Sequence, residues 1–542
     1  MTDAVVIGSG PNGLVAANLL VDAGWSVVVL EAQPTIGGAV RTDTELSPDF
    51  RSDTFSAFYP LAAASKTIQG LELEQHGLTW VHAPAVLGNP MPDGTWAMLH
   101  RKREDTAAGL EELCAGDGAA WLELCDRWDR LGSHLIGSLL DPFPPIRSGA
   151  KLAGNLPRAG GLSAVRLLLM TVRRLGEEYF EGEGPRLLLA GNALHADFSP
   201  EGAGSAVFGL LLTMLGQNIG FPVPQGGAGE LIAALARRFE SMGGEIHTDS
   251  EVSSVVIRSW PSGRCEAGER RRGQRRSCRG RGRLSACACM AVWSPSTSCR
   301  HALGEAWSAS SGTRPPSRST GPCRALCPGS QPLRSRRAPY TSHIQSTSCP
   351  SSPARSAATR FPRRLLLLMG QMTTADPTRS KPGTESLWAY SHVPQAPHGD
   401  AGEEGIRGVW DESDLERFAD RMQRRIERFA PDLSSRIVAR RVLGPREFQA
   451  RDANLHMGAI NGGTAGLHQE LVFRPVPGLG RAETPIKSLY LGSASAHPGG
   501  GVHGAPGANA AKAALAHDRL RRLRPNRRKS SGLTAVLHLL RS

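Results

Sequence analysis

The first sixty residues alternate between short apolar runs and a longer helical pattern. Residues 4–7 and 26–30 are almost entirely apolar, which is typical of strands buried on both faces of a parallel sheet. Between them, residues 14–23 predict a helix that ends at Gly24. The order strand, helix, strand predicts a βαβ unit, and therefore an α/β fold for this part of the chain.

Three glycines occupy the turn between the first strand and the helix. Gly8 suits a tight turn, Gly10 lets the backbone approach a pyrophosphate, and Gly13 lets the helix pack against the strand. The helix N-terminus offers free N–H groups and a positive dipole to phosphates. Glu31, 18 residues after Gly13, is placed to accept hydrogen bonds from ribose, and its charge disfavours a 2′-phosphate. The pattern predicts a dinucleotide site rather than an ordinary glycine turn.

A second glycine pair follows the acidic residue. Gly37 and Gly38 allow another stretch of backbone to approach the cofactor, and Arg41 is placed to neutralise a phosphate. With these motifs the sequence resembles the FAD-dependent phytoene desaturase and flavin amine oxidase superfamily, and most closely its phytoene-dehydrogenase-like branch. Many members carry a basic residue directly after the glycine pair, where this chain has Ala39. The resemblance implies FAD and a glutathione-reductase-like, Rossmann-like FAD-binding domain beside a second α+β substrate domain.

Two later stretches follow the order of the same family. A Pro-Gln-Gly-Gly turn at 224–227 leads into an expected helix at 231–242 and expected strands at 245–248 and 251–257. By resemblance, Val252 contacts the adenine. A strand at 488–491, a glycine-rich loop at 492–504 and a helix at 505–515 resemble the closing FAD motif. This resemblance implies that the cofactor lies beside Gly492, Gly501, Val502 and Gly504.

Two histidines of the closing loop, His497 and His503, are open to two interpretations. They are either catalytic bases or side chains that pack and hydrogen-bond beside the flavin ring, and the second is favoured. No acid–base pair stands out, so no catalytic residue is assigned, and no metal site is expected. The apolar stretches 166–172 and 208–215 are too short to cross a bilayer. They indicate core rather than the lining of an apolar tunnel.

The positive charge of the chain is concentrated in one segment. Residues 261–364 hold 20 of the 63 Lys and Arg residues but only 3 of the 50 Asp and Glu residues, and eight of the ten cysteines. The remaining residues are slightly acidic, so the net charge of +13 does not by itself indicate a nucleic-acid binder. The cysteine spacings do not form a zinc pattern.

Four interpretations of residues 261–364 compete. The segment is an Arg-rich nucleic-acid arm, a disordered insert, a divergent folded region, or an out-of-frame translation. We favour the last, because a GC-rich gene in the wrong frame yields Arg, Ser, Pro and Cys, and the segment contains no Lys, Asp or Asn. On this hypothesis the segment is disordered, the strands that the family has there are missing, and a sheet edge is exposed.

The expected organisation is therefore discontinuous. Residues 1–60, 220–260 and 470–517 form the FAD-binding domain, residues 61–219 and 365–469 form the substrate domain, and residues 518–542 form a basic tail. The tail is expected to be a solvated end, with contact to an anionic membrane as the alternative.

The resemblance implies an FAD-dependent oxidoreductase that passes hydride from a hydrophobic substrate to flavin N5. Amine oxidation is the enzymatic alternative, and a non-catalytic flavoprotein with a disrupted middle segment is the alternative of another class. The substrate is expected to be a hydrophobic small molecule rather than nucleic acid; the electron acceptor and oligomeric state stay open. The N-terminus lacks a secretory signal pattern, so a cytoplasmic location is expected, with peripheral membrane association as the alternative.

Overall fold

A parallel sheet of five strands lies at the centre of the nucleotide-binding half of the protein. The computed structural model describes residues 2–260, 264–271, 288–291, 360–394, 397, 399–463 and 465–523. The strand order is β15 (Leu489–Leu491), β12 (Ala288–Ala291), β1 (Ala4–Ile7), β2 (Val27–Leu30) and β9 (Glu245–His247), all parallel. This arrangement confirms the α/β class that the N-terminal βαβ pattern predicts.

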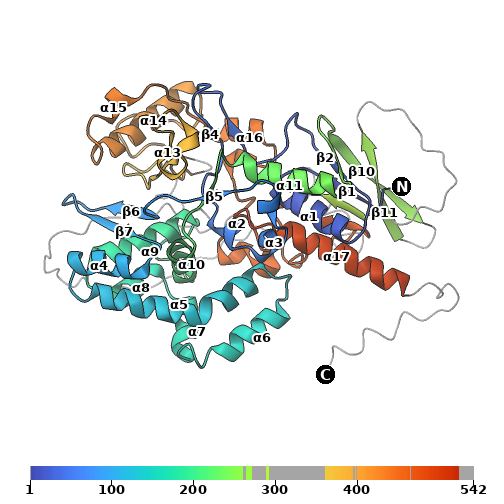
Figure 1. Ribbon diagram of the computed structural model, residues 1–542, viewed down its shortest axis with the longest axis horizontal. Helices are drawn as coiled ribbons and strands as arrows, with labels where there is room; N and C mark the ends of the chain where they lie inside the picture. The colour runs from blue at the N-terminus through green and yellow to red at the C-terminus, as the bar shows by residue number, and fades with distance from the viewer. Residues whose placement is uncertain are drawn as a thin grey trace, which may run out of the picture.

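Three helices pack beside this sheet and close its core (Figure 1). They are α1 (Pro11–Asp22), α11 (Gly229–Ser241) and α17 (Ala505–Arg522). Buried side chains of α1 contact both of the other helices, so α1 joins segments that lie more than 200 residues apart in the sequence. Each helix lies within a few residues of its predicted position, although α17 continues to Arg522, beyond the predicted end.

The central position of β12 corrects the prediction that residues 261–364 contribute no strand and leave the sheet edge open. The backbone of β12 pairs with β1 on one side and with β15 on the other. Residues 286–293 are an uninterrupted apolar run, the pattern of a buried parallel strand, which the averaged composition of the segment conceals. A second strand of the segment, β11 (Arg264–Arg271), pairs with β10 (Val252–Trp260). The prediction of disorder for most of the segment concerns residues outside the described ones.

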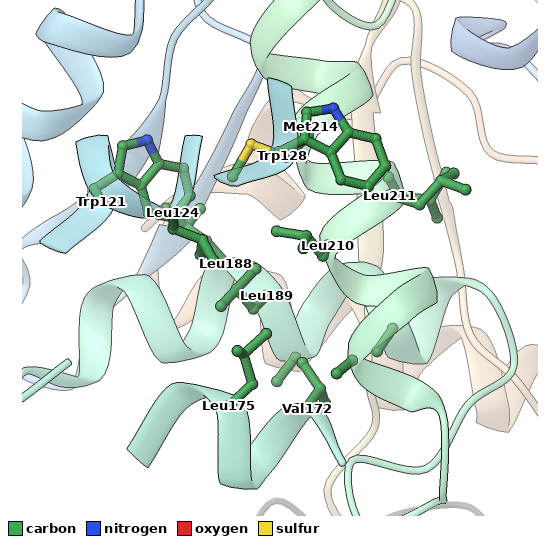
Figure 2. Close-up of a cluster of buried hydrophobic side chains, with 14 of the residues drawn as sticks. Trp121, Leu124, Trp128, Val172, Leu175, Leu188, Leu189, Leu210, Leu211 and Met214 are labelled. Carbon is green, nitrogen blue, oxygen red and sulfur yellow. The ribbon is translucent and has the colours of Figure 1, made fainter. Parts of the chain in front are cut away.

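A layer of helices forms a second core. Trp121, Leu188 and Leu210 are fully or almost fully buried at its centre, and Figure 2 shows how the side chains of this cluster face one another. The stretch 208–215 contributes to this cluster, which confirms its assignment as core, whereas Leu169 at the end of a neighbouring helix points to solvent. The helices of the layer are α4 (Arg103–Leu113), α5 (Asp117–Leu140), α6 (Ile146–Asn155), α7 (Leu162–Leu169), α8 (Val172–Tyr179), α9 (Glu183–His195) and α10 (Ser205–Asn218).

Small strand pairs and short helices connect the two cores. The pairs are β3 (Thr42–Asp43) with β4 (Ser52–Asp53), β5 (Trp80–Val81) with β8 (Val223–Pro224), β6 (Leu87–Pro90) with β7 (Trp96–Leu99), and β13 (Leu368–Gln371) with β14 (Leu387–Tyr390). The short helices are α2 (Pro60–Ala64), α3 (Lys66–Gln69), η1 (Leu73–His76), α13 (Met372–Ala375), η2 (Pro377–Arg379), α15 (Leu433–Arg436), α16 (Pro445–Arg451), η3 (His456–Gly458), η4 (Leu467–Gln469) and η5 (Leu471–Phe473). The longer α14 (Glu412–Glu427) packs on a third apolar cluster around Phe361 and Trp410.

Candidate functional site

The turn between β1 and α1 has the backbone of a phosphate-binding loop. Gly8 adopts a φ of 96°, a conformation that side chains other than glycine rarely take. Gly10 is the N-cap residue of α1, with extended φ and ψ of −64° and 170°, and no side chain caps the helix. Pro11 follows at the first helical position, where its missing N–H costs nothing. The N-terminus of α1 is therefore open to an anion.

Glu31 is buried at the end of β2 and is bound to this loop. One of its carboxylate oxygens accepts from the backbone N–H and the hydroxyl of Ser9, at 2.8 and 2.7 Å, and the other accepts from the N–H of Gln33. The Ser9 hydroxyl oxygen also accepts from the N–H of Gly37 at 3.3 Å. A carboxylate can accept about four hydrogen bonds, so Glu31 keeps capacity for a ribose hydroxyl. Sequence reasoning missed Ser9, which holds the two glycine motifs and Glu31 together.

The two glycine motifs lie against each other. A Cβ atom at Gly38 would lie 3.2 Å from the Cα of Gly10, and a Cβ atom at Gly10 would lie 3.9 Å from the Cα of Gly38. Gly37 has a φ of 121°, and a Cβ there would lie 2.6 Å from the carbonyl oxygen of Val40. The carboxylate of Asp452 would lie 3.5 Å from a Cβ at Gly38. The glycines themselves leave the backbone bare, which is what close approach to a pyrophosphate requires.

The closing glycine loop brings a second helix N-terminus to the same place. Gly504, in the left-handed region with a φ of 70°, is the N-cap residue of α17. A Cβ atom at Gly507 would lie 1.9 Å from the carbonyl oxygen of Asn12, so the first turns of α17 and α1 are in direct contact. Val502 has a φ of 56°, a strained conformation for a β-branched residue. Strain of this kind is concentrated at functional sites, because the surrounding structure has to enforce it.

Unpartnered polar atoms at these helix ends and at the second glycine motif fit a bound dinucleotide. Three of them, the amide oxygen of Asn12, Nε of Arg41 and the amide nitrogen of Asn509, are buried and have no hydrogen-bond partner among the described residues. Buried polar atoms of native proteins are normally paired, so each of these has capacity for a group of a bound ligand. One acceptor and two donors suit the mixed hydroxyl and phosphate chemistry of a dinucleotide. The residues present therefore fit such a cofactor.

The two histidines of the closing loop are neutral and buried. His503 accepts from the N–H of Ala505 through Nδ1 and donates from Nε2 to the carbonyl of Gly500, at 3.1 Å each. Burial lowers the pKa of His503 to about 4. Nε2 of His497 contacts the carbonyl oxygen of Asp141, and burial lowers the pKa of His497 as well. Nδ1 of His497 is buried and has no partner among the described residues, and the choice between a packing and a catalytic role stays a prediction for both histidines.

A buried arginine, Arg474, stabilises the closing glycine loop. Arg474 donates to the carbonyls of Asn461 and Ala494, at 2.7 and 2.8 Å, and pairs with Glu470 at 3.0 Å. A Cβ atom at Gly499 would lie 3.1 Å from the guanidinium carbon of Arg474, so the glycine is needed for this contact. Burial raises the pKa of Glu470 to about 7 even though Arg474 lies beside it. Arg474 thus positions the loop, and sequence reasoning assigned it no such role.

An aromatic row on one face of β14 ends at a tyrosine–histidine pair. The Tyr390 hydroxyl contacts Nδ1 of His195 at 2.5 Å. Trp388 stacks on Tyr390, with ring centroids 5.3 Å apart, and Phe58 lies 5.9 Å from Trp388. Phe58 is three residues before Leu61, whose side chain would touch a Cβ at Gly501. The row therefore runs from Phe58 to His195 at the end of α9 in the helical layer.

Val252, the predicted adenine contact, lies outside the glycine turns described above. It begins β10 and pairs with Arg271 of β11. The preceding strand, β9, pairs with β2, and the N–H of Ser250 donates to the carbonyl of Glu31 at 2.7 Å. Val252 therefore follows a turn that is tied to Glu31, and its contact with an adenine stays a prediction. Gly13 lies inside α1, and Gly492 packs against α17.

Residues 6–71 match the family described as an NAD(P)-binding Rossmann-like domain. Together with the parallel sheet, this match indicates a dinucleotide-binding Rossmann-like domain, and the similar proteins support an oxidoreductase. The chain is 29% identical to pyridine nucleotide-disulfide oxidoreductase domain-containing protein 2 of Mus musculus, over 94% of this chain and 92% of that protein. It is 27% identical to hydroxyneurosporene desaturase of Cereibacter sphaeroides, over 46% of this chain and 50% of that protein. A solved oxidoreductase from Methanosarcina mazei is 15% identical, with a TM-score of 0.52, and covers 95% of this chain and 99% of its own.

These similarities confirm the resemblance to the FAD oxidoreductase superfamily and the expected fold class, and they support an oxidoreductase with a dinucleotide cofactor. Within the described residues there is no helix long and apolar enough to cross a membrane. The same part of the chain holds no cluster of three or more side chains that suits a metal ion. The assignment of Gly8, Gly10, Glu31, Arg41 and the other predicted contacts to individual cofactor atoms stays a prediction.

Proposed function

We propose that this protein is an FAD-dependent oxidoreductase that dehydrogenates an apolar substrate. The observation that carries the proposal is the meeting of the N-termini of α1 and α17 with two glycine motifs, beside three polar atoms that have no partner among the described residues. This arrangement supports one extended dinucleotide rather than a small anion. The names of the relatives, a pyridine nucleotide-disulfide oxidoreductase domain-containing protein and a hydroxyneurosporene desaturase, support oxidation–reduction chemistry.

The roles of the residues follow from their positions. The N-terminus of α1 and Arg41 would hold the phosphates, Glu31 would hold a ribose, and the loop around Gly501 and Val502 would lie against the ring system. When bound, FAD supplies a hydride acceptor. The neutral His503 fixes the start of α17, and Arg474 fixes the loop that precedes it. The row of Phe58, Trp388 and Tyr390 would exclude water and orient an apolar substrate.

Amine oxidation is the second candidate, and the stacked Trp388 and Tyr390 favour it. Two aromatic rings beside a reacting centre can orient an amine, which the sequence alone did not reveal. A hydrocarbon substrate needs only apolar side chains around it, whereas an amine also needs the electron-rich faces of the aromatic rings. Replacement of Tyr390 by Leu separates the candidates. The variant should keep dehydrogenation of a hydrocarbon within a few fold, and should lose most of any amine oxidation.

The first experiment is the visible spectrum of the purified full-length chain, with identification of the cofactor released on denaturation. A stoichiometric FAD spectrum supports the proposal, and bleaching of that spectrum by an isoprenoid or an amine under anaerobic conditions then selects between the two substrates. Release of NAD in place of FAD, or a folded protein that stays colourless in excess FAD, would contradict the proposal.

A further inference from the structure

The helices α6 and α7 present an apolar and basic surface that no other described part of the protein covers. Among all large apolar side chains of the described residues, only five are more than 60% exposed, and three of them lie here. They are Ile146, Leu162 and Leu169, with exposed fractions of 75, 87 and 68%. Figure 1 places both helices at the lower edge of the molecule, below α5. We call residues 142–175 the α6–α7 arm.

The exposure follows from how α7 sits on the protein. Ala164 and Leu167 are buried on its inner face, against neighbouring helices. Leu162 and Leu169 are seven residues apart, two helical turns, and so share the opposite face. The helix is therefore anchored by one apolar face while it presents a second one to solvent. Helices with one covered face do not normally carry a second apolar face unless it contacts something.

The charge of the arm is of one sign. Residues 142–175 contain six Lys and Arg residues and no Asp or Glu. Three of the six, Arg166, Arg173 and Arg174, pair with glutamates outside the arm. The other three, Arg147, Lys151 and Arg158, are exposed and form no ion pair with the part of the chain that the structure describes. In the sequence these three cations lie between Ile146 and Leu162.

We propose that the α6–α7 arm docks this protein on an anionic lipid surface. Short helices with exposed leucine and isoleucine beside unpaired cations insert the apolar side chains between headgroups, while the cations contact lipid phosphates. A second copy of the chain would bring three unpaired cations against three, so self-association through this face is disfavoured. The basic tail that begins at 518 also carries exposed apolar side chains, Leu520 and Leu523, so the test treats it as a separate source of binding. Docking does not depend on the proposed redox chemistry.

The test is flotation of the full-length chain with vesicles of phosphatidylcholine alone, and of phosphatidylcholine mixed with phosphatidylglycerol. The wild type should float with the anionic vesicles and much less with the neutral ones. The triple variant Ile146→Ser, Leu162→Ser, Leu169→Ser keeps every charge and should lose about tenfold or more of the binding. A matched control replaces Val438, Val409 and Met242 by Ser, three exposed apolar residues elsewhere, and should bind like the wild type.

Further measurements separate the other possible sources of vesicle binding. The variant Arg147→Gln, Lys151→Gln, Arg158→Gln should lose the preference for anionic vesicles and keep its thermal stability. If the basic tail or residues 261–364 were responsible, binding would survive the triple serine change and disappear in high salt, which would overturn the proposal. Concentration-dependent dimerisation that the serine change abolishes, with no vesicle binding, would overturn it as well. The single change Leu162→Glu repeats the test with minimal disturbance, since that side chain is 87% exposed.

Discussion

A methyl group added at Gly10 should weaken cofactor binding without destabilising the fold. A Cβ at this position would meet no protein atom closer than 3.9 Å, and φ of −64° suits alanine, so Gly10→Ala leaves the fold intact. The methyl group would instead occupy the space that a pyrophosphate needs. We expect cofactor affinity to fall by about 100-fold or more with little change in the unfolding midpoint. Gly109→Ala, in α4 and also free of contacts, is the control and should retain the cofactor. Equal retention by both variants would show that Gly10 is not at the phosphates.

His503 makes the stability of the closing loop depend on pH. Its pKa is about 4 in the folded protein, against an ordinary value near 6.5, so the unfolded chain binds more protons between these values. Stability is therefore lost as pH falls through that window. Glu470, with a raised pKa of about 7, shifts stability in the opposite sense, so the comparison must be made against His503→Gln. From pH 7 to 4.5 the wild type should lose roughly 2–3 kcal/mol more unfolding free energy than the variant. Parallel urea-unfolding curves at both pH values would contradict this.

At the scale of elements, one buried arginine joins three segments. Arg379 is fully buried and pairs at 2.9 Å with Asp376 and with Asp53 of β4, while these carboxylates also accept from the N–H groups of Gly226 and Ala228. Arg379→Met leaves two buried carboxylates without their cation and should cost about 3–5 kcal/mol. Lys381→Met removes an exposed pair with Asp49 and should cost less than about 1 kcal/mol. Similar denaturation midpoints for both variants would mean that the network contributes little.

The elements that could be predicted from the sequence are those with local signals. The strand before Gly8 and the helix after it are marked by an apolar run and by glycine spacing, and the structure has both, with α1 beginning at Pro11. The pairing of Tyr390 with His195 has no such signal, because 194 residues separate the two side chains and only the fold brings them together. Arg474 is similar: its partners are backbone carbonyls, which leave no trace in a sequence pattern.

For the whole molecule, the average composition of residues 261–364 led to a wrong prediction about the central sheet, whereas the apolar run at 286–293 marks the strand. Residues 261–364 are unusual on average, and yet 288–291 form the strand next to β1. Without this strand, β1 and β15 would not be joined, and the closing loop that follows β15 would lose its link to the fingerprint turn that follows β1. The out-of-frame hypothesis stays a prediction. Resequencing of the coding DNA tests it: paired insertions or deletions near codons 258 and 365 would support it, and an uninterrupted frame would contradict it.

The position of β12 leads to a prediction about the entire sheet. A parallel strand between two partners uses its N–H groups in the ladder, so hydrogen exchange at residues 289–291 should be as slow as exchange in β1. Met290→Pro removes one ladder donor from the middle of the sheet and should destabilise the protein by about 3 kcal/mol or more. The same change should weaken cofactor binding, because β1 and β15 carry the two glycine loops. Exchange at the rate of an unstructured peptide, together with a harmless Met290→Pro change, would mean that β1 and β15 are held in place without β12.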